Sequence, residues 1–290
     1  MKLFPRIIIP FLIPYLIISC SKTLDVPLPI TSADAKALEL YNQGYNLLIQ
    51  NEWLEAKNLF EEALTIDPDL ILANLFISEG ADIVVNYLKS KNNAEMLLKN
   101  NESCSSKILL IQADVSDKKS LNHLIESTLD EFGRIDIWVN NAGADILTGD
   151  AASANTADKL ERLIETDLKG TINACWSVSE IMKQQGHGVI VNMGWDLSIH
   201  GFKGLNPQIF AASKSAVLGF TRSFANSVAP IIRVNMVSPG VLPNGIRPEG
   251  ARVVAYEDVT RAVLFLAGEE AGEVNGANIE VSGGWSLGMN

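Results

Sequence analysis

Cysteine and histidine are scarce in this sequence, and their scarcity excludes two kinds of stabilising site. The chain has 290 residues but only three cysteines and three histidines. Cys20, Cys104 and Cys175 are too few for a disulfide framework, and none lies at metal-ligand spacing from a histidine. We therefore expect no metal site, and we interpret Cys175 as a small buried apolar side chain.

Positive charge is also sparse. Lys and Arg number 23 against 34 Asp and Glu, which leaves a formal net charge of -11. The basic residues form no dense cluster, whereas contacts to a phosphate backbone need concentrated positive charge. We therefore expect no nucleic-acid partner. Apolar residues, by contrast, make up 47% of the chain, enough to bury a sizeable core in one or two domains.

The N-terminus carries a long apolar stretch. Lys2 and Arg6 precede an apolar run at residues 7–18, which ends just before Cys20. This order is typical of a signal peptide, and the run is too short to span a bilayer as a helix. The residues before Cys20 resemble a bacterial lipobox, so we expect a signal peptide at residues 1–20 and a lipid anchor on Cys20. The protein would then be exported or membrane-anchored. If the run instead packs on the domain, the protein is cytoplasmic.

A pair of helical patterns follows a polar, proline-containing linker at residues 21–32. The patterns cover residues 33–49 and 54–66, within a predicted hairpin at residues 33–70. Small and apolar residues occur there at the spacing of one tetratricopeptide repeat of about 34 residues: Gly44, Ala56, Phe60, Ala63 and Pro68. The alternative is a generic amphipathic hairpin. Because stacked repeats share a continuous core, a single copy favours docking onto the chain or a protein partner over a peptide groove.

The remainder, residues 71–290, alternates strand and helix patterns and is predicted to form one domain. Apolar strands are expected at residues 83–87, 108–112, 135–139, 189–192, 231–237 and 277–281. Helical patterns lie at residues 121–132, 157–183, 211–227 and 257–266. Continuous apolar strands separated by helices predict a mainly parallel sheet covered on both faces. The fold class is therefore α/β, with a doubly wound, Rossmann-like sheet.

From about Leu70 onward, several short motifs occur in the order of one known family. They are Asp114-Val115, Val139-Asn140-Asn141-Ala142-Gly143, Arg233-Val234-Asn235, Ser238-Pro239-Gly240 and Gly283-Gly284. Any one match is weak, but together and in this order they resemble the short-chain dehydrogenase/reductase family. The resemblance implies an oxidoreductase of carbonyl or hydroxyl groups that uses NAD or NADP, and a homo-oligomer.

The resemblance also implies which residues lie along the cofactor. Asp114 and Val115 would lie at the adenine, and Asn140, Ala142 and Gly143 in the turn beside the cofactor. Pro239 and Gly240 would lie over the nicotinamide, and Lys214 at its ribose. Asn86, at the end of its strand, leaves NADP permissible because it is not acidic.

The family's first strand and glycine-rich phosphate loop are missing. They would precede the helix that starts near Leu70, where this chain has Asp67-Pro68-Asp69 and no glycine. Glycines let backbone amides approach a pyrophosphate at a helix N-terminus. The two carboxylates would repel that group, so dinucleotide binding is in question. The sheet is expected to lack its first strand, and either another segment fills the gap or the neighbouring strands close up.

The catalytic positions that the resemblance implies are altered as well. The family's Tyr-x-x-x-Lys pair is Phe210 and Lys214 here, and a phenyl ring cannot transfer a proton. Trp195 and Asp196 occupy the stretch where the family has its serine, and Ser198 is displaced from it. The family's helix asparagine is Asp167.

Two interpretations of these charged residues remain open. Asp167, Asp196 and Lys214 could form a cluster with different acid–base chemistry, or one or both aspartates could simply neutralise a buried Lys214. Three functions follow: a degenerate reductase with little or no activity, an active oxidoreductase of unusual mechanism, or an exported lipoprotein whose hairpin is an interaction module.

Overall fold

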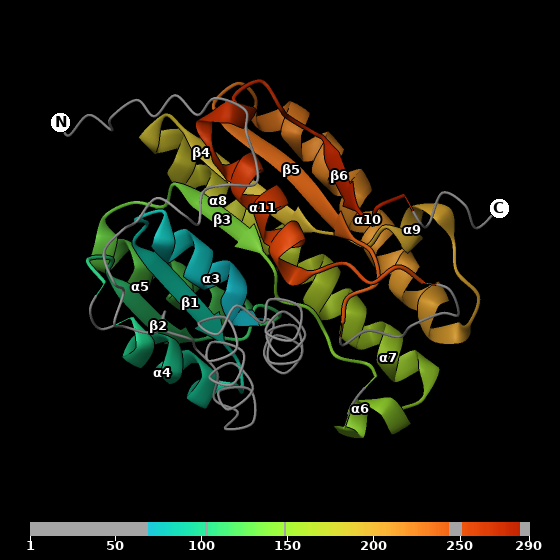
Figure 1. The fold of residues 1–290 in the computed structure, drawn as a ribbon. Helices are drawn as coiled ribbons and strands as arrows, with labels where there is room; N and C mark the ends of the chain where they lie inside the picture. The colour runs from blue at the N-terminus through green and yellow to red at the C-terminus, as the bar shows by residue number, and fades with distance from the viewer. Residues whose placement is uncertain (1–68, 102–103, 148, 244–250, 285–290) are drawn as a thin grey trace, which may run out of the picture.

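The computed structural model describes residues 69–101, 104–147, 149–243 and 251–284 (Figure 1). Its strands form two parallel sheets. The smaller sheet pairs β1 (Ile83–Tyr87) with β2 (Ile108–Gln112). The larger sheet has the order β3–β4–β5–β6. Its strands are β3 (Ile137–Asn140), β4 (Gly188–Met193), β5 (Ile232–Pro239) and β6 (Asn278–Val281).

Helices connect the strands as parallel pairing requires. Those of the front half are α3 (Asp69–Ser78), α4 (Lys91–Asn100), α5 (Lys118–Phe132), α6 (Gly149–Ser153) and α7 (Thr156–Leu163). A π-helical turn, Ile164–Gly170, joins α7 to α8 (Thr171–Gln185). They are followed by α9 (Leu197–His200), α10 (Leu205–Val228), α11 (Tyr256–Ala267) and a 3₁₀ turn at Glu269–Ala271. No helix in the described ranges is long and apolar enough to cross a bilayer.

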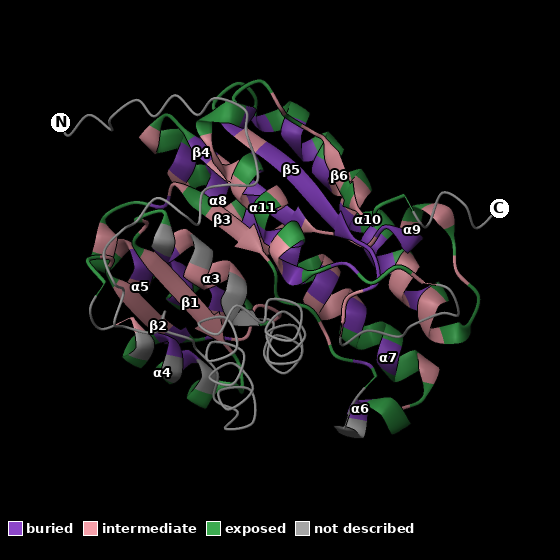
Figure 2. Cartoon of the chain, in the orientation of Figure 1, coloured by how far each residue is buried: buried purple, intermediate pink, exposed green. Residues whose placement is uncertain are grey.

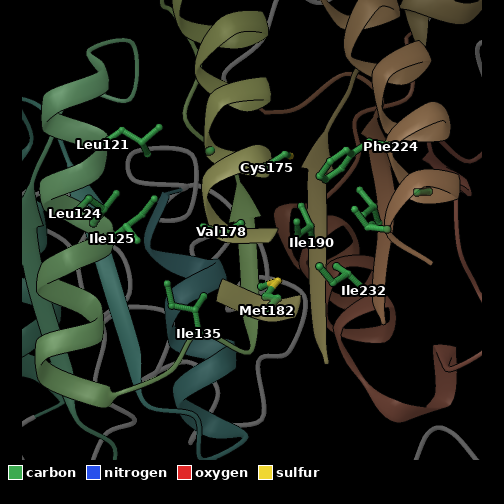
Figure 3. Close-up of a cluster of buried hydrophobic side chains, with 14 of the residues drawn as sticks. Leu121, Leu124, Ile125, Ile135, Cys175, Val178, Met182, Ile190, Phe224 and Ile232 are labelled. Atoms are coloured by element: carbon green, nitrogen blue, oxygen red, sulfur yellow. The ribbon is translucent and has the colours of Figure 1, made fainter. Parts of the chain in front are cut away.

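The two faces of the larger sheet are covered by different helices. Ile190 belongs to a cluster that it shares with α5, α8 and α10, through side chains such as Leu121, Cys175 and Phe224 (Figure 3). Val191, the next residue of β4, packs instead with side chains of α11. Because successive strand residues point to opposite faces, this alternation shows a sheet buried on both sides. The prediction of a doubly wound α/β fold is confirmed.

Among the described residues, a break separates the two sheets at the place where the sequence predicts that a strand is missing. In the described part of the chain, β1 pairs only with β2, and β3 pairs only with β4. The neighbouring strands have therefore not closed up. Helices hold the two parts together, since one apolar cluster joins Ile111 of β2 to Ile190 of β4. The predicted signal peptide, linker and helical hairpin lie outside the described residues.

The predicted elements differ from the structure mainly in the long helical pattern at residues 157–183. The π-helical turn interrupts it and buries Asp167 and Gly170. A Cβ at Gly170 would lie 3.1 Å from the carbonyl oxygen of Val115, so glycine favours the close approach of the turn to the segment after β2. Such π-helical turns are frequent at functional sites, and apolar periodicity alone does not reveal them. The apolar periodicity of the sequence also did not predict α4, which lies at the edge of the fold (Figure 1).

Truncation of Met182 tests the larger core. Its side chain is 0% exposed on α8 and lies among the residues drawn in Figure 3. We expect Met182→Ala to lower the free energy of unfolding by about 2–5 kcal/mol, because it removes buried methylenes and leaves a cavity. Urea unfolding followed by circular dichroism measures the loss. Lys183→Ala, at the exposed next position, should change it by no more than about 0.5 kcal/mol. Equal effects of both substitutions would contradict this packing.

Candidate functional site

The candidate site lies where the carboxyl ends of β3, β4 and β5 meet. In open α/β sheets, ligands bind in the crevice at these ends. The ends here carry Asn140, Met193 and Pro239. The π-helical turn and α10 pack beside them and contribute Asp167 and Lys214.

Asp167 and Lys214 form a buried ion pair in this site. Their Oδ2 and Nζ atoms are 3.0 Å apart, and the two side chains are 0% and 8% exposed. Oδ1 of Asp167 accepts a hydrogen bond from the backbone N–H of Ala144 at 2.7 Å. Lys214 also donates to the carbonyl oxygen of Met193 at 3.2 Å. Both charges are therefore satisfied inside the protein, as buried charges must be.

Aromatic rings flank this ion pair. The Nζ of Lys214 lies 5.5 Å from the ring centroid of Phe210, within range of a cation–π interaction. The Phe210 ring in turn meets Trp195 edge to face, with centroids 5.1 Å apart. The hydroxyl of Ser198 donates to the carbonyl oxygen of Trp195 at 2.6 Å. The position beside Lys214 is thus apolar, and Phe210 offers no proton donor to a reacting oxygen.

Asp196 is not the ion-pair partner of Lys214. Its side chain is 0% exposed, and its backbone N–H donates to the carbonyl oxygen of Pro239 at 3.1 Å. Its Oδ2 lies close to Gly240, where an added Cβ would come within 3.4 Å. Among the described residues, Asp167 is the carboxylate that pairs with Lys214. The structure thus brings together two of the three charged residues that the sequence singled out.

Asn140 anchors the turn after β3 through a polar network that sequence reasoning missed. Its Nδ2 donates to Oδ1 of Asn192 at 2.8 Å, and Nδ2 of Asn192 donates to the hydroxyl of Thr221 at 2.8 Å. Cys175 takes part, since the same Asn140 amide points at its sulfur at 3.3 Å. Burial raises the pKa of the Cys175 thiol to about 12. The sequence does carry a signal for this network. Asn192 and Thr221 each interrupt an apolar pattern of a buried strand or helix, and buried amides and hydroxyls need hydrogen-bond partners.

The turn that follows is open on one side. Ala142 and Gly143 are exposed, and an added Cβ at Gly143 would lie 3.5 Å from Oδ2 of Asp167. Pro239 and Gly240, by contrast, are buried, and the Gly240 N–H donates to the carbonyl oxygen of Val281 at 2.9 Å. Gly143 therefore lies beside the Asp167 carboxylate, whereas Gly240 lies beside Asp196 and Ser282.

Asp114 and Val115, the residues predicted at the adenine, follow β2 of the smaller sheet. The Oδ1 of Asp114 accepts from both the backbone N–H and the hydroxyl of Ser116, at 2.9 and 2.6 Å. Val115 packs against Gly170. The side chain of Asn86, which the sequence connected with NADP, donates to the carbonyl oxygen of Ala113 at 2.8 Å. These contacts stabilise the ends of β1 and β2.

The described residues include the positions that the resemblance predicts at both ends of a dinucleotide. The adenine-end and nicotinamide-end positions are present, but Lys214 is held by Asp167 and by a backbone carbonyl. Asp67 comes before α3 and Asp69 is its first residue, at the helix N-terminus where the resemblance predicts the pyrophosphate. The described residues also hold no group of His, Cys, Asp and Glu that could bind a metal ion.

Comparison with known proteins identifies the family. Residues 70–249 match the short chain dehydrogenase family. The chain belongs to this family. A 3-oxoacyl-(acyl-carrier-protein) reductase of Thermotoga maritima is 33% identical over 226 residues, which cover 72% of this chain and 89% of the relative. The 2-(R)-hydroxypropyl-CoM dehydrogenase of Xanthobacter autotrophicus is 31% identical, with 75% and 93% covered. The crystal structure of levodione reductase superimposes with a TM-score of 0.66 at 26% identity, covering 75% of this chain and 92% of that one.

Within this short-chain dehydrogenase fold, loss of one partner of the ion pair has a large expected effect. Asp167→Asn leaves the ammonium group of Lys214 buried without a counter-charge. We expect it to lower the free energy of unfolding by about 3–5 kcal/mol in urea denaturation. The matched control is the exposed pair of Arg261 and Asp258, 3.0 Å apart, where Asp258→Asn should lower it by no more than about 1 kcal/mol.

The double variant Asp167→Asn/Lys214→Met tests whether the stability is lost through the unpaired charge or through changed packing. Since it removes the uncompensated charge, it should recover part of the lost stability. If Asp167→Asn had no larger effect than the exposed control, the pair would not be buried in solution.

The network around Cys175 predicts a difference between two thiols. The thiolate is the reactive form, so a buried thiol with a pKa of about 12 should resist iodoacetamide at about pH 8. Exposed Cys104 should react. Peptide mapping by mass spectrometry measures both. Because the folded pKa lies above the ordinary 9.0, this group stabilises the fold below about pH 9, and the contribution is lost as the pH rises towards 12. Rapid native labelling of Cys175 would show that the helix α8 opens readily.

Proposed function

We propose that this chain is a short-chain dehydrogenase/reductase-type protein whose NAD- or NADP-dependent activity on carbonyl or hydroxyl substrates is weak or absent. The observation that carries the proposal is Phe210, whose ring lies beside Lys214 with no hydroxyl to exchange a proton. General acid–base catalysis by a positioned side chain contributes about 10²–10⁴-fold to such reactions. The relatives named above are reductases and dehydrogenases, which supports the reaction class.

The surroundings of Phe210 support the same conclusion. A hydroxyl placed there would need a cation nearby to favour its deprotonated form, and Lys214 is present. However, Asp167 already neutralises that cation, and Trp195 covers the other edge of the ring. The chain's own residues therefore hold a neutral, apolar side chain at the point where a proton would have to move.

Weak dinucleotide binding is the second part of the proposal. Asp69 begins the α3 helix and Asp67 comes shortly before it, at the position where the family's glycines receive the pyrophosphate. Two negative charges at that position oppose a third negative group. We expect calorimetric titration with NADH or NADPH to give a Kd no tighter than about 1 mM, which is about -4 kcal/mol. The exported-lipoprotein alternative depends on residues outside the described ranges.

Restoring a phenol tests the proposal directly. We expect Phe210→Tyr to raise kcat/KM for NADPH- or NADH-dependent reduction of a 3-oxoacyl thioester by about 10²-fold or more, because it supplies a proton donor. Phe210→Leu is the control, since it changes the packing without adding a hydroxyl. Initial rates, followed by the absorbance of the reduced nicotinamide over a range of substrate concentrations, give kcat/KM. If the unaltered chain already turned over as fast as the Phe210→Tyr variant, the proposal would be wrong.

A further inference from the structure

A second buried lysine lies on α7. Lys159 is 7% exposed, and Figure 2 shows α7 as a mostly exposed helix, of which Lys159 and Leu163 are the buried residues. The Nζ of Lys159 donates to the carbonyl oxygen of Ala152 at 2.9 Å and to Oδ1 of Asn206 at 3.5 Å. An ammonium group has three donors, so one of them has no acceptor among the described residues.

No carboxylate of the described residues forms an ion pair with Lys159. Lys214, by contrast, has Asp167 at 3.0 Å. The acid next to Lys159 in the sequence is Asp158, and its carboxylate accepts a hydrogen bond from the side-chain amide of Asn155 at 2.8 Å. Burying a charge without a counter-charge is strongly unfavourable. The described part of the chain therefore keeps a positive charge that its own side chains do not neutralise.

The contact with Asn206 places this ammonium at the N-terminus of a long helix. Asn206 is the second of the 24 residues of α10, and no side chain caps the helix at Gly204. The N–H of Gln208 donates to the carbonyl oxygen of Gly204 at 3.1 Å, and Pro207 has no N–H. The amides of Leu205 and Asn206 therefore have no acceptor within the helix. Such a helix end carries a partial positive charge.

Support of the fold explains only one contact of Lys159. Ala152 belongs to the last turn of α6, and a cation is favourable at the C-terminal end of a helix. The same ammonium also lies beside the first turn of α10, where a cation is unfavourable. Exposed Lys203, two residues before α10, adds positive charge there. An anion between the ammonium and the free amides of α10 would be attracted by both.

This place is adjacent to the candidate functional site. Asn206 and Phe210 are four residues apart on α10, so they share a face of the helix at about 5–6 Å. Lys159 and Leu163 are four residues apart on α7 in the same way. Leu163 packs in one cluster with Ile209 and Phe210. An anion at Lys159 would therefore lie about one helical turn from the altered catalytic position.

We propose that Lys159 and the first turn of α10 bind the carboxylate group of a small ligand. The remaining donor of the ammonium and the amides of Leu205 and Asn206 would donate to the carboxylate oxygens. Charge balance favours a carboxylate over a phosphate, because a carboxylate brings one negative charge to one buried ammonium and a phosphate brings more. The proposal rests on the contacts of α7 and α10 and is independent of whether the protein has redox activity.

Titration of the full chain with sodium acetate, followed by NMR at constant ionic strength, tests this site. The reporters are the backbone amide signals of Leu205 and Asn206, which should shift and saturate. Lys159→Met removes the charge and keeps an unbranched side chain. We expect it to weaken acetate binding at least about tenfold, because a charge-assisted hydrogen bond is lost. Exposed Lys203→Met is the matched control and should weaken binding by no more than about threefold.

Urea unfolding in acetate-free chloride buffer separates anion binding from a structural role. Lys159→Met should leave the unfolding midpoint unchanged or raise it, because it removes an unneutralised buried charge. A lysine that only supported the fold would give a lower midpoint. Asn206→Asp supplies the missing carboxylate from the chain itself, so it should raise the midpoint and abolish the acetate titration. Asn206→Ala is the control that lacks the new charge, and its midpoint should not rise.

Three results would overturn the proposal. The reporter shifts could grow linearly with acetate, as a general salt effect does. Acetate could bind Lys159→Met as tightly as the unaltered chain, or the midpoint of this variant could fall while the unaltered chain binds no acetate. Inorganic phosphate, titrated in the same way, could bind more tightly than acetate, which would exclude a carboxylate site. If Lys159→Met does not fold, as judged by circular dichroism, the opposite responses of Asn206→Asp and Asn206→Ala decide the question.

Discussion

Burial of the larger sheet on both faces is the constraint on which the rest of the molecule depends. Ile190 and Val191 are both 0% exposed although they point to opposite faces of β4. Removing apolar surface from water is the main favourable contribution to folding, and two covered faces double the surface that each strand contributes. Right-handed crossovers then place the strand ends together at one edge. That edge is where Lys214, Asp167 and Phe210 meet.

The two buried charges at this edge pair with each other. Lys214 contacts the Asp167 carboxylate and the backbone carbonyl oxygen of Met193. Asp167 also accepts a hydrogen bond from the backbone N–H of Ala144. The adjoining network of Asn140, Asn192 and Thr221 is likewise closed by hydrogen bonds.

The divided sheet is the other physical consequence of an altered front end. Helices α3 and α11 on one face, and α5 and α8 on the other, pack across the break, so the two sheets keep a common core without common hydrogen bonds. Open edges of apolar strands are prone to pair with other chains. Natural proteins cover such edges or place charges on them. The half-buried valines of β1 provide no charge at this edge.

The sequence alone determined the fold class, the order of strands and the identity of the altered positions. Apolar periodicity placed β1 and β2 with their observed bounds, because these short strands are continuous runs of branched side chains. Only the tertiary structure decided that Asp167, and not Asp196, pairs with Lys214, and that a π-helical turn carries it there. The reason is that spacing along the chain reports the period of one element, whereas an ion pair depends on how separate elements pack against one another.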